Sequence, residues 1–174
     1  MLLDKNDPIL RQPSEAVAET EFSSPELKEL ADRLFKIMEE TGAVGVAAPQ
    51  IGISKRVIVF GTEYSKYRAP ETHIPCTALI NPSFKILSDE KEIGWEGCLN
   101  CGDLRGNVSR AVEIEYSGFD LDGNRITKQA SGLEARILQH EIDHLDGFLF
   151  LDRMEDKDSL TNAHNLEKEK KLKK

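Results

Sequence analysis

The residues best suited to chemistry in this chain are two histidines and a glutamate in its C-terminal third. His140, Glu141 and His144 form the pattern H-E-x-x-H. On a helix, residues four apart lie one turn apart on the same face, so both imidazoles can reach one metal ion. The glutamate beside the first histidine is then placed to exchange a proton with a water molecule at that metal. The pattern therefore predicts a metal-dependent hydrolase.

The same pattern also fits a plain amphipathic helix that buries two histidines. Residues 132–145 are predicted to form the helix, which Asp146 and Gly147 end. Leu138 and Ile142 can then face the core, which favours a folded, positioned motif over a chance match.

The third metal ligand decides the class of hydrolase. One class of zinc endopeptidase places a histidine six residues after the second motif histidine, where this chain has Phe150. Thermolysin-like enzymes take a glutamate from a following helix, but Glu155 is too close and Glu167 lies in a charged tail. The remaining candidates lie upstream, at Cys98 or Cys101, and a thiolate suits zinc or ferrous iron.

Cys98 and Cys101 form a C-x-x-C pair that has two other interpretations. A zinc ribbon needs a second such pair, which the sequence lacks. A redox pair usually opens a helix, and Gly102 and Asp103 are poor residues to start one. We expect one cysteine to be the ligand and the other to be incidental.

The elements around these residues predict an α+β fold. Ser24 and Pro25 start a helix at 25–40, and Thr41 and Gly42 end it. Asn81 and Pro82 are predicted to stop a strand. The predicted strands are 56–60, 77–80, 84–87, 111–116 and 125–128. We expect antiparallel sheets around the central motif helix, with N- and C-terminal helices, in a single domain of residues 1–174. The last helix is predicted from Asp156, in a lysine-rich helix or tail at about 156–174.

Composition narrows the partners and the compartment. The chain has 23 Lys and Arg against 31 Asp and Glu, a net charge of −8, which disfavours DNA as a partner. No apolar run approaches the roughly 18 residues that span a bilayer, so we expect no membrane segment. Three cysteines without a signal-like N-terminus predict a cytoplasmic protein.

Three segments, in this order, resemble the peptide deformylase family. They are residues 45–50 (G-V-A-A-P-Q), 96–99 (E-G-C-L) and 139–145 (Q-H-E-I-D-H-L). The resemblance extends over nearly the whole chain to about residue 154. Together the three segments are highly specific, although each alone is weak.

The resemblance implies a role for each matching residue. The metal ligands would be Cys98, His140 and His144. Glu141 would be the acid–base residue, and Gln50 with the backbone N–H of Leu99 would face the oxyanion. The implied substrate-binding residues are Val44, Gly45, Glu96, Gly97 and Arg105.

The resemblance also implies a substrate and a cofactor. The substrate would be the N-formyl group on the methionine of newly synthesised proteins, released as formate. The expected metal is Fe2+, with Zn2+, Ni2+ or Co2+ as substitutes. We favour a monomer, and the lysines of residues 165–174 suggest contact with the ribosome near its exit tunnel; a solvated chain end is the alternative.

The chain departs from the family pattern beside the expected ligand. The family usually has glycine, serine and an apolar residue where this chain has Ala43, Asn100 and Cys101. No expected ligand or acid–base residue is altered, so activity is predicted and substrate preference is open. Two other interpretations are a deacylase or peptidase on the same scaffold and a non-catalytic protein that keeps the metal for stability.

Overall fold

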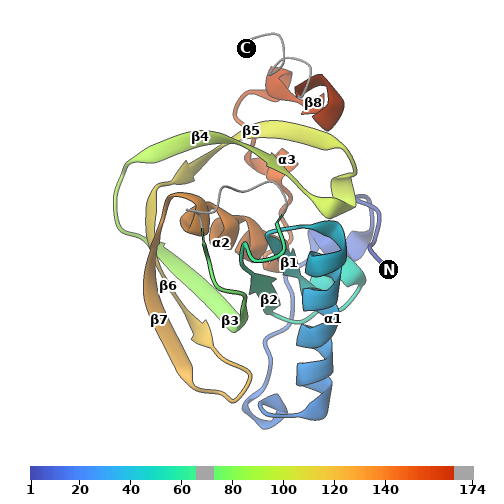
Figure 1. Cartoon of the computed structure of the whole chain (residues 1–174), viewed down its shortest axis with the longest axis vertical. Helices are drawn as coiled ribbons and strands as arrows, with labels where there is room; N and C mark the ends of the chain where they lie inside the picture. Colours follow the sequence, from blue (N-terminus) through green and yellow to red (C-terminus); the bar gives the residue numbers. More distant parts are fainter. Residues whose placement is uncertain (66–72, 167–174) are drawn as a thin grey trace.

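Two antiparallel sheets and a buried helix organise the chain in the computed structural model, which describes residues 1–65 and 73–166 (Figure 1). The larger sheet has the strand order β1-β2-β3-β6-β7, and the smaller has the order β4-β5-β8. The strands are β1 (Gly45–Ala47), β2 (Val57–Phe60), β3 (Thr77–Ile86), β4 (Lys91–Gly97), β5 (Leu104–Ala111), β6 (Glu113–Phe119), β7 (Arg125–Ser131) and β8 (Thr161–Asn162). The helices are α1 (Pro25–Thr41), α2 (Gly132–Leu145) and α3 (Phe150–Arg153), with 3-10 turns η1 (Pro8–Arg11), η2 (Glu19–Glu21), η3 (Ala48–Ile51), η4 (Leu99–Cys101) and η5 (Lys157–Ser159).

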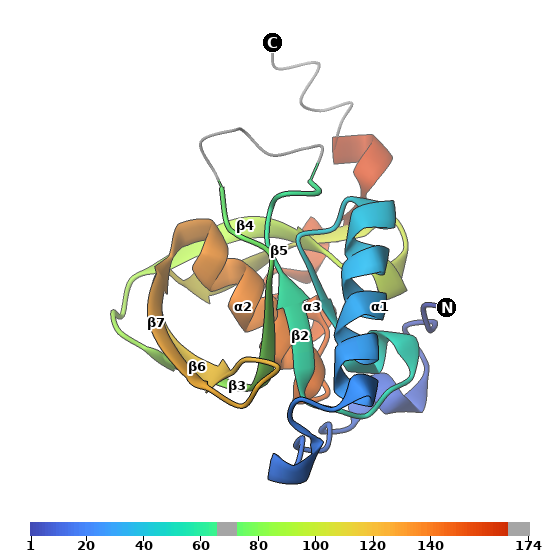
Figure 2. The same ribbon diagram turned by 60° about the horizontal axis from the view of Figure 1, so that its bottom comes forward.

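The larger sheet separates α1 from α2, as Figure 2 shows. Successive side chains of a strand point to opposite faces, and β2 uses this alternation to serve two cores. Val57 and Val59 pack in the core that contains α1, whereas Ile58 and Phe60 pack in the core that contains α2. All four residues are buried, which explains why β2 is apolar throughout.

The helix α1 begins and ends where its sequence signals predict. The Ser24 hydroxyl accepts a hydrogen bond from the Leu27 N–H at 3.2 Å, and Pro25 occupies the first turn. Gly42 adopts a φ of 70°, a conformation that glycine reaches without strain. The predicted helix at 25–40 is confirmed, with one more residue at its C-terminal end.

The helix α2 spans the predicted residues 132–145 and is enclosed on most sides. The strands β4 and β5 pass over it, and the larger sheet lies on its other side (Figure 1). From Ala135 to Leu145, every residue except Arg136 and His140 is buried. The helix therefore carries polar side chains into the interior, where each needs a partner.

The strand predictions need correction around Asn81. β3 continues through Asn81 and Pro82 instead of stopping there, and its register against β6 shifts between Ile80 and Ser83. Asn81 adopts a φ of 50°, and this irregularity lets a proline without an N–H sit within the strand. The predicted strand at 111–116 is divided, because β5 ends at Ala111 and β6 begins at Glu113.

The strand β4 escaped prediction because its apolar alternation is inverted. Ile93 and Trp95 are exposed, at 67% and 42%, while Glu96 on the opposite face is buried. The predicted C-terminal helix is wrong over residues 157–162, where η5 and β8 form on either side of Leu160. Helical residues follow at 163–166, and the lysine-rich residues 167–174 lie outside the described residues.

Candidate metal and active site

The C-terminal half of α2 places His140, Glu141 and His144 in the interior. The two imidazole rings lie edge to face, with centroids 5.0 Å apart and planes at 83°. Glu141 and His144 are 4% and 1% exposed. The predicted helical spacing therefore does bring both imidazoles to one place.

Cys98 joins the histidines from the end of β4. It follows Gly97 and precedes η4, and its sulfur lies 3.4 Å from Nε2 of His144. One ligand atom from each of Cys98, His140 and His144 lies within 4.8 Å of the other two. Among the described residues this is the single such group of histidine, cysteine and carboxylate side chains, and Cys101 is not part of it. We call these three residues the ligand cluster.

Glu96 sets the orientation of His140. Its carboxylate accepts the Nδ1–H of His140 at 2.9 Å, which leaves Nε2 with its lone pair for the cluster. Burial acts to raise the pKa of Glu96, but hydrogen bonds from His140 and Arg110 outweigh it and hold that pKa far below its usual range. For His140, burial acts to lower the pKa, and the hydrogen bond to Glu96 raises it above its usual value.

A chain of buried ion pairs continues from Glu96 beneath the cluster. Arg110 donates to both oxygens of Glu96 at 2.9 Å and to Asp143 at 2.6 Å. Arg136 donates to Glu96 at 3.0 Å, and Arg153 donates to Asp143 at 2.6 Å. Since Arg110, Glu96 and Asp143 are buried, each depends on its partners, whereas Arg153 is partly exposed; these ion pairs tie α2 to β4 and β5.

Glu141 is the least satisfied polar side chain in this region. Its Oε2 is buried without a hydrogen-bond partner in the part of the chain that the structure describes. Burial raises the pKa of Glu141 to about 7. A Cβ on Gly45 would overlap Oε1 of Glu141 and lie 2.7 Å from its Cδ. The glycine is therefore required by Glu141 itself, which refines the expectation that Gly45 serves the approach of a substrate.

The cluster has the chemistry of a cation site. Burial lowers the pKa of His144 well below its usual value, so its ring is neutral and can offer a lone pair. A hydrogen bond shared with Cys101, together with burial, raises the pKa of the Cys98 thiol, so a thiolate there requires a nearby cation. Imidazole nitrogens and a cysteine sulfur are ligands that zinc and ferrous iron accept. The residues present therefore fit a divalent transition metal.

Gln50 approaches the cluster from η3. Its Nε2 lies 3.4 Å from the Cys98 sulfur, and its Oε1 accepts the Ala47 N–H at 2.7 Å. Leu99 is the first residue of η4, so its N–H is not used by the bonds of that helical turn. Both predicted oxyanion donors therefore flank Cys98.

The remaining predicted substrate residues divide into two groups. Val44 and Gly45 belong to or adjoin β1, the edge strand of the larger sheet. Arg105 folds over Gly97 and donates to the carbonyl oxygens of Gly102 at 3.2 Å and Leu104 at 2.7 Å. The Glu96 carboxylate is buried and pairs with the side chains of Arg110, Arg136 and His140. Its carboxylate orients His140, and the predicted contact of Glu96 with substrate stays a prediction.

Comparison with known proteins identifies the family to which the chain belongs. Residues 1–159 match the family model described as polypeptide deformylase. The chain belongs to the polypeptide deformylase family.

Relatives named peptide deformylase match most of the chain. It is 43% identical over 155 residues to peptide deformylase 1 of Bordetella pertussis, which covers 89% of this chain and 87% of the relative. The crystal structure of a class I type b peptide deformylase from Acinetobacter baumannii with Met-Ala-Ser bound matches with a TM-score of 0.81 and 34% identity, over 88% of this chain and 97% of that one. Peptide deformylase of Plasmodium falciparum matches with a TM-score of 0.80 and 37% identity, over 91% and 88%.

Membership of the deformylase family confirms the predicted identity and reaction class. Deformylases are metal-dependent hydrolases that remove the N-formyl group from newly synthesised proteins. The predicted α+β class with antiparallel sheets is confirmed as well. Among the described residues, no helix has both the length and the apolar content to cross a bilayer.

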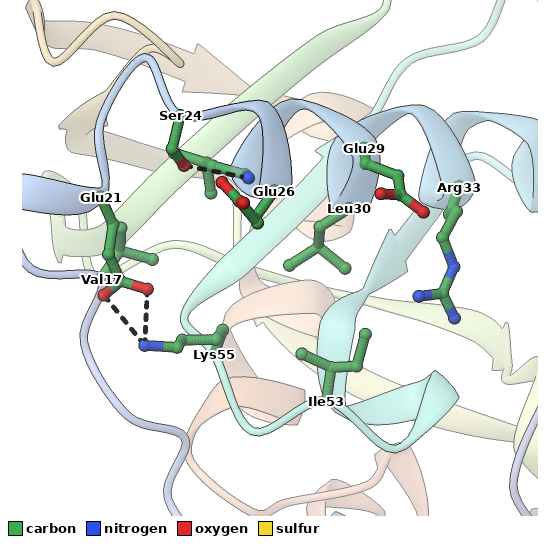
Figure 3. A pocket seen from close by; sticks show the side chains of 10 residues that line it. Val17, Glu21, Ser24, Glu26, Glu29, Leu30, Arg33, Ile53 and Lys55 are labelled. Carbon is green, nitrogen blue, oxygen red and sulfur yellow. Dashed lines mark hydrogen bonds and ion pairs between the residues drawn. The ribbon is translucent and has the colours of Figure 1, made fainter.

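A surface pocket elsewhere on this deformylase lies apart from the ligand cluster. Figure 3 shows it between the start of α1 and the segments around Val17 and Ile53. Leu30 contributes to its apolar lining, and the ion pair of 2.9 Å between Lys55 and Glu21 lies at one side of it. It lies on the α1 side of the larger sheet, whereas the cluster lies on the α2 side.

Several residues that support the ligand cluster were not predicted from the sequence. Asn100 was noted only as a departure from the family pattern, although it bonds Gln50. Asp143 lies inside the motif and Arg136 lies one turn before His140, so helical spacing from the motif offered a signal for both. Nothing in the local sequence could indicate that Arg110 reaches across to α2.

Proposed function

We propose that the chain hydrolyses the formyl–methionyl amide at the ligand cluster, with Cys98, His140 and His144 holding Fe2+. Zn2+, Ni2+ and Co2+ are the alternative ions, since the same sulfur and imidazole donors accept them. The observation that carries this proposal is the convergence of three ligand atoms within 4.8 Å beside the buried, partnerless carboxylate of Glu141. When bound, such an ion supplies Lewis-acid chemistry that makes a water molecule far more acidic.

Glu141 is proposed as the acid–base residue. Its burial makes it a stronger base than an exposed glutamate, so it can take a proton from the attacking water near neutral pH. The oxygen of that water bonds to the formyl carbon, and the carbon–nitrogen bond then breaks. Glu141 returns its proton to the leaving amine, which yields formate and a free methionyl N-terminus.

Gln50 and Leu99 are proposed to stabilise the charge that develops on the formyl oxygen. The Gln50 amide already points an N–H at the Cys98 sulfur. Leu99 directly follows Cys98, so its N–H belongs to the peptide bond next to the proposed ligand. Loss of one such donor typically lowers kcat by about 10² to 10³.

The peptide part of the substrate is proposed to add a strand to the free edge of β1. β1 is at the end of its sheet, so the backbone groups of Gly45 on the side away from β2 are available to an extended peptide, whereas the Val44 carbonyl accepts the Gly61 N–H on the β2 side. Gly97 of β4 and Arg105 of β5 would lie on the other side of the bound peptide, opposite β1. The Met-Ala-Ser peptide bound by the Acinetobacter relative supports a substrate of this class.

We further propose that residues 1–174 form one catalytic domain, that it acts as a monomer in the cytoplasm, and that its lysine tail contacts the ribosome.

The tail proposal concerns residues outside the described part of the chain. Pelleting of ribosomes at rising salt, with the full chain and with a chain lacking the last ten residues, tests it. Equal pelleting of both forms would remove the tail from consideration.

Substrate choice and Glu141→Gln test the proposed reaction together. Formyl-Met-Ala should be hydrolysed far faster than acetyl-Met-Ala, and Glu141→Gln should lose turnover while it retains the metal. Elemental analysis after anaerobic purification identifies the ion. Equal hydrolysis of the acetyl peptide would indicate a broader deacylase, and undiminished turnover by Glu141→Gln would exclude Glu141 as the base.

A further inference from the structure

We propose that Asn100 is a positioning residue, which holds the Gln50 amide in the one orientation that directs an N–H toward the Cys98 sulfur and the reacting formyl oxygen. The proposal rests on the function proposed above, because it concerns the donor that Gln50 supplies. It assigns a purpose to a residue that sequence comparison marks only as a departure.

Asn100 binds both the side chain and the main chain of Gln50. Its Oδ1 accepts a hydrogen bond from Gln50 Nε2 at 2.8 Å, and its Nδ2 donates to the Gln50 carbonyl oxygen at 3.1 Å. The Asn100 side chain is buried, at 6% exposure, and it lies two residues after Cys98. These contacts join η3, which carries Gln50, to η4, which follows the proposed ligand.

The hydrogen bonds of Gln50 allow only one amide orientation. Oε1 accepts the Ala47 N–H at 2.7 Å, and one of the two Nε2 hydrogens goes to Asn100. The other Nε2 hydrogen is left for the Cys98 sulfur, 3.4 Å away. If the amide were rotated by 180°, its NH2 would face the Ala47 N–H and its oxygen would face Asn100 Oδ1. Both contacts would be repulsive, so the N–H that faces the cluster is fixed.

The N-terminal segment closes this arrangement. The second hydrogen of Asn100 Nδ2 is donated to the Leu3 carbonyl oxygen at 2.7 Å, and the Leu3 N–H binds the Gln50 carbonyl at 3.0 Å. Asn100 can therefore not rotate its own amide without losing its bonds to both carbonyls. Residues from three separate segments thus hold Gln50 in place before substrate arrives.

A donor fixed in this way needs no rearrangement when charge develops on the formyl oxygen, which is the condition for effective stabilisation. In Asn100→Leu, the Gln50 amide keeps Ala47 but loses the partner that fixes its NH2 group. We expect kcat to fall about tenfold while KM changes little, against about 10² for Gln50→Leu, which removes the donor itself.

A double-mutant cycle separates positioning from general structural support. If Asn100 acts through Gln50, the Gln50→Leu/Asn100→Leu variant should have the same kcat as Gln50→Leu alone. Effects that multiply to about 10³ would overturn the proposal. Asn81→Asp serves as the control, since Asn81 likewise clamps an N-terminal residue by bonding the N–H and carbonyl of Val17 at 2.9 Å. Its effect should multiply with that of Gln50→Leu.

NMR of the metal-free protein gives a readout that does not depend on activity. The resonances of the Gln50 NH2 group, identified by their absence in Gln50→Leu, should exchange slowly with water in the wild-type chain and in Asn81→Asp. They should shift and exchange faster in Asn100→Leu, and unchanged resonances would overturn the proposal. If Asn100→Leu does not fold, Asn100→Ala, which removes every hydrogen bond of this side chain without adding bulk, replaces it in both measurements. Absence of deformylase activity in the wild type would refute the proposed function, whereas the NMR result would still decide the role of Asn100.

Discussion

Replacing Glu141 by glutamine should stabilise the metal-free protein, and more so as the pH rises. The carboxylate is buried without a hydrogen-bond partner among the described residues, and burial raises its pKa from the ordinary 4.5 to about 7. A carboxyl group with a raised pKa in the folded state contributes its full share of stability below about pH 4.5. That share is lost as the pH rises through 7, because the folded chain must then hold a buried charge.

The size of the effect follows from the two pKa values. The difference between about 7 and 4.5 corresponds to about 3 kcal/mol of unfolding free energy at pH 8, and to less than about 1 kcal/mol at pH 5. Glutamine has nearly the same shape and carries no charge, so Glu141→Gln should remove the pH-dependent part. The gain should therefore be about 2 to 3 kcal/mol larger at pH 8 than at pH 5.

Urea denaturation of chelator-treated protein between pH 5 and pH 8 measures this difference. Glu134→Gln, a partly buried glutamate on the same helix, controls for the removal of a carboxylate from α2. Parallel stability curves for wild type and Glu141→Gln would show that the buried carboxylate is not strained in the folded state. That result would refute the reasoning from burial, and with it the argument for Glu141 as an activated base.

Three further predictions concern neighbouring residues. Cys98→Ser should lose most of its bound metal by elemental analysis, while Cys101→Ser keeps it, because only Cys98 belongs to the ligand cluster. Equal loss of metal from both variants would show that Cys98 is not the specific cysteine ligand. Gly45→Ala should lower kcat by about 10², since the added methyl overlaps Glu141 and displaces it; unchanged kcat would show that Glu141 can move freely. Arg110→Met should destabilise the fold by about 3 to 5 kcal/mol in urea, because it removes the buried cation that Glu96 and Asp143 share; a loss below about 1 kcal/mol would contradict the importance of the buried ion pairs.

The features that depend on neighbours in sequence were predictable. A serine cap and a terminal glycine define α1, and helical spacing alone places His140 and His144 on one face of α2. These signals act over a single helical turn, so they can be read without the rest of the fold. The order of three short motifs was enough to predict the family and the reaction class.

Tertiary structure decided how the site is assembled. The choice of Cys98 over Cys101, left open by residue type alone, depends on the direction in which β4 delivers its last residues. The Glu96 carboxylate orients His140, a role that the sequence did not indicate, since β4 turns that face inward. Strand pairing and burial join residues far apart in the chain, and no local pattern encodes them. The raised pKa of Glu141 is a property of that enclosure, because an exposed helix with the same H-E-x-x-H sequence would leave its glutamate solvated.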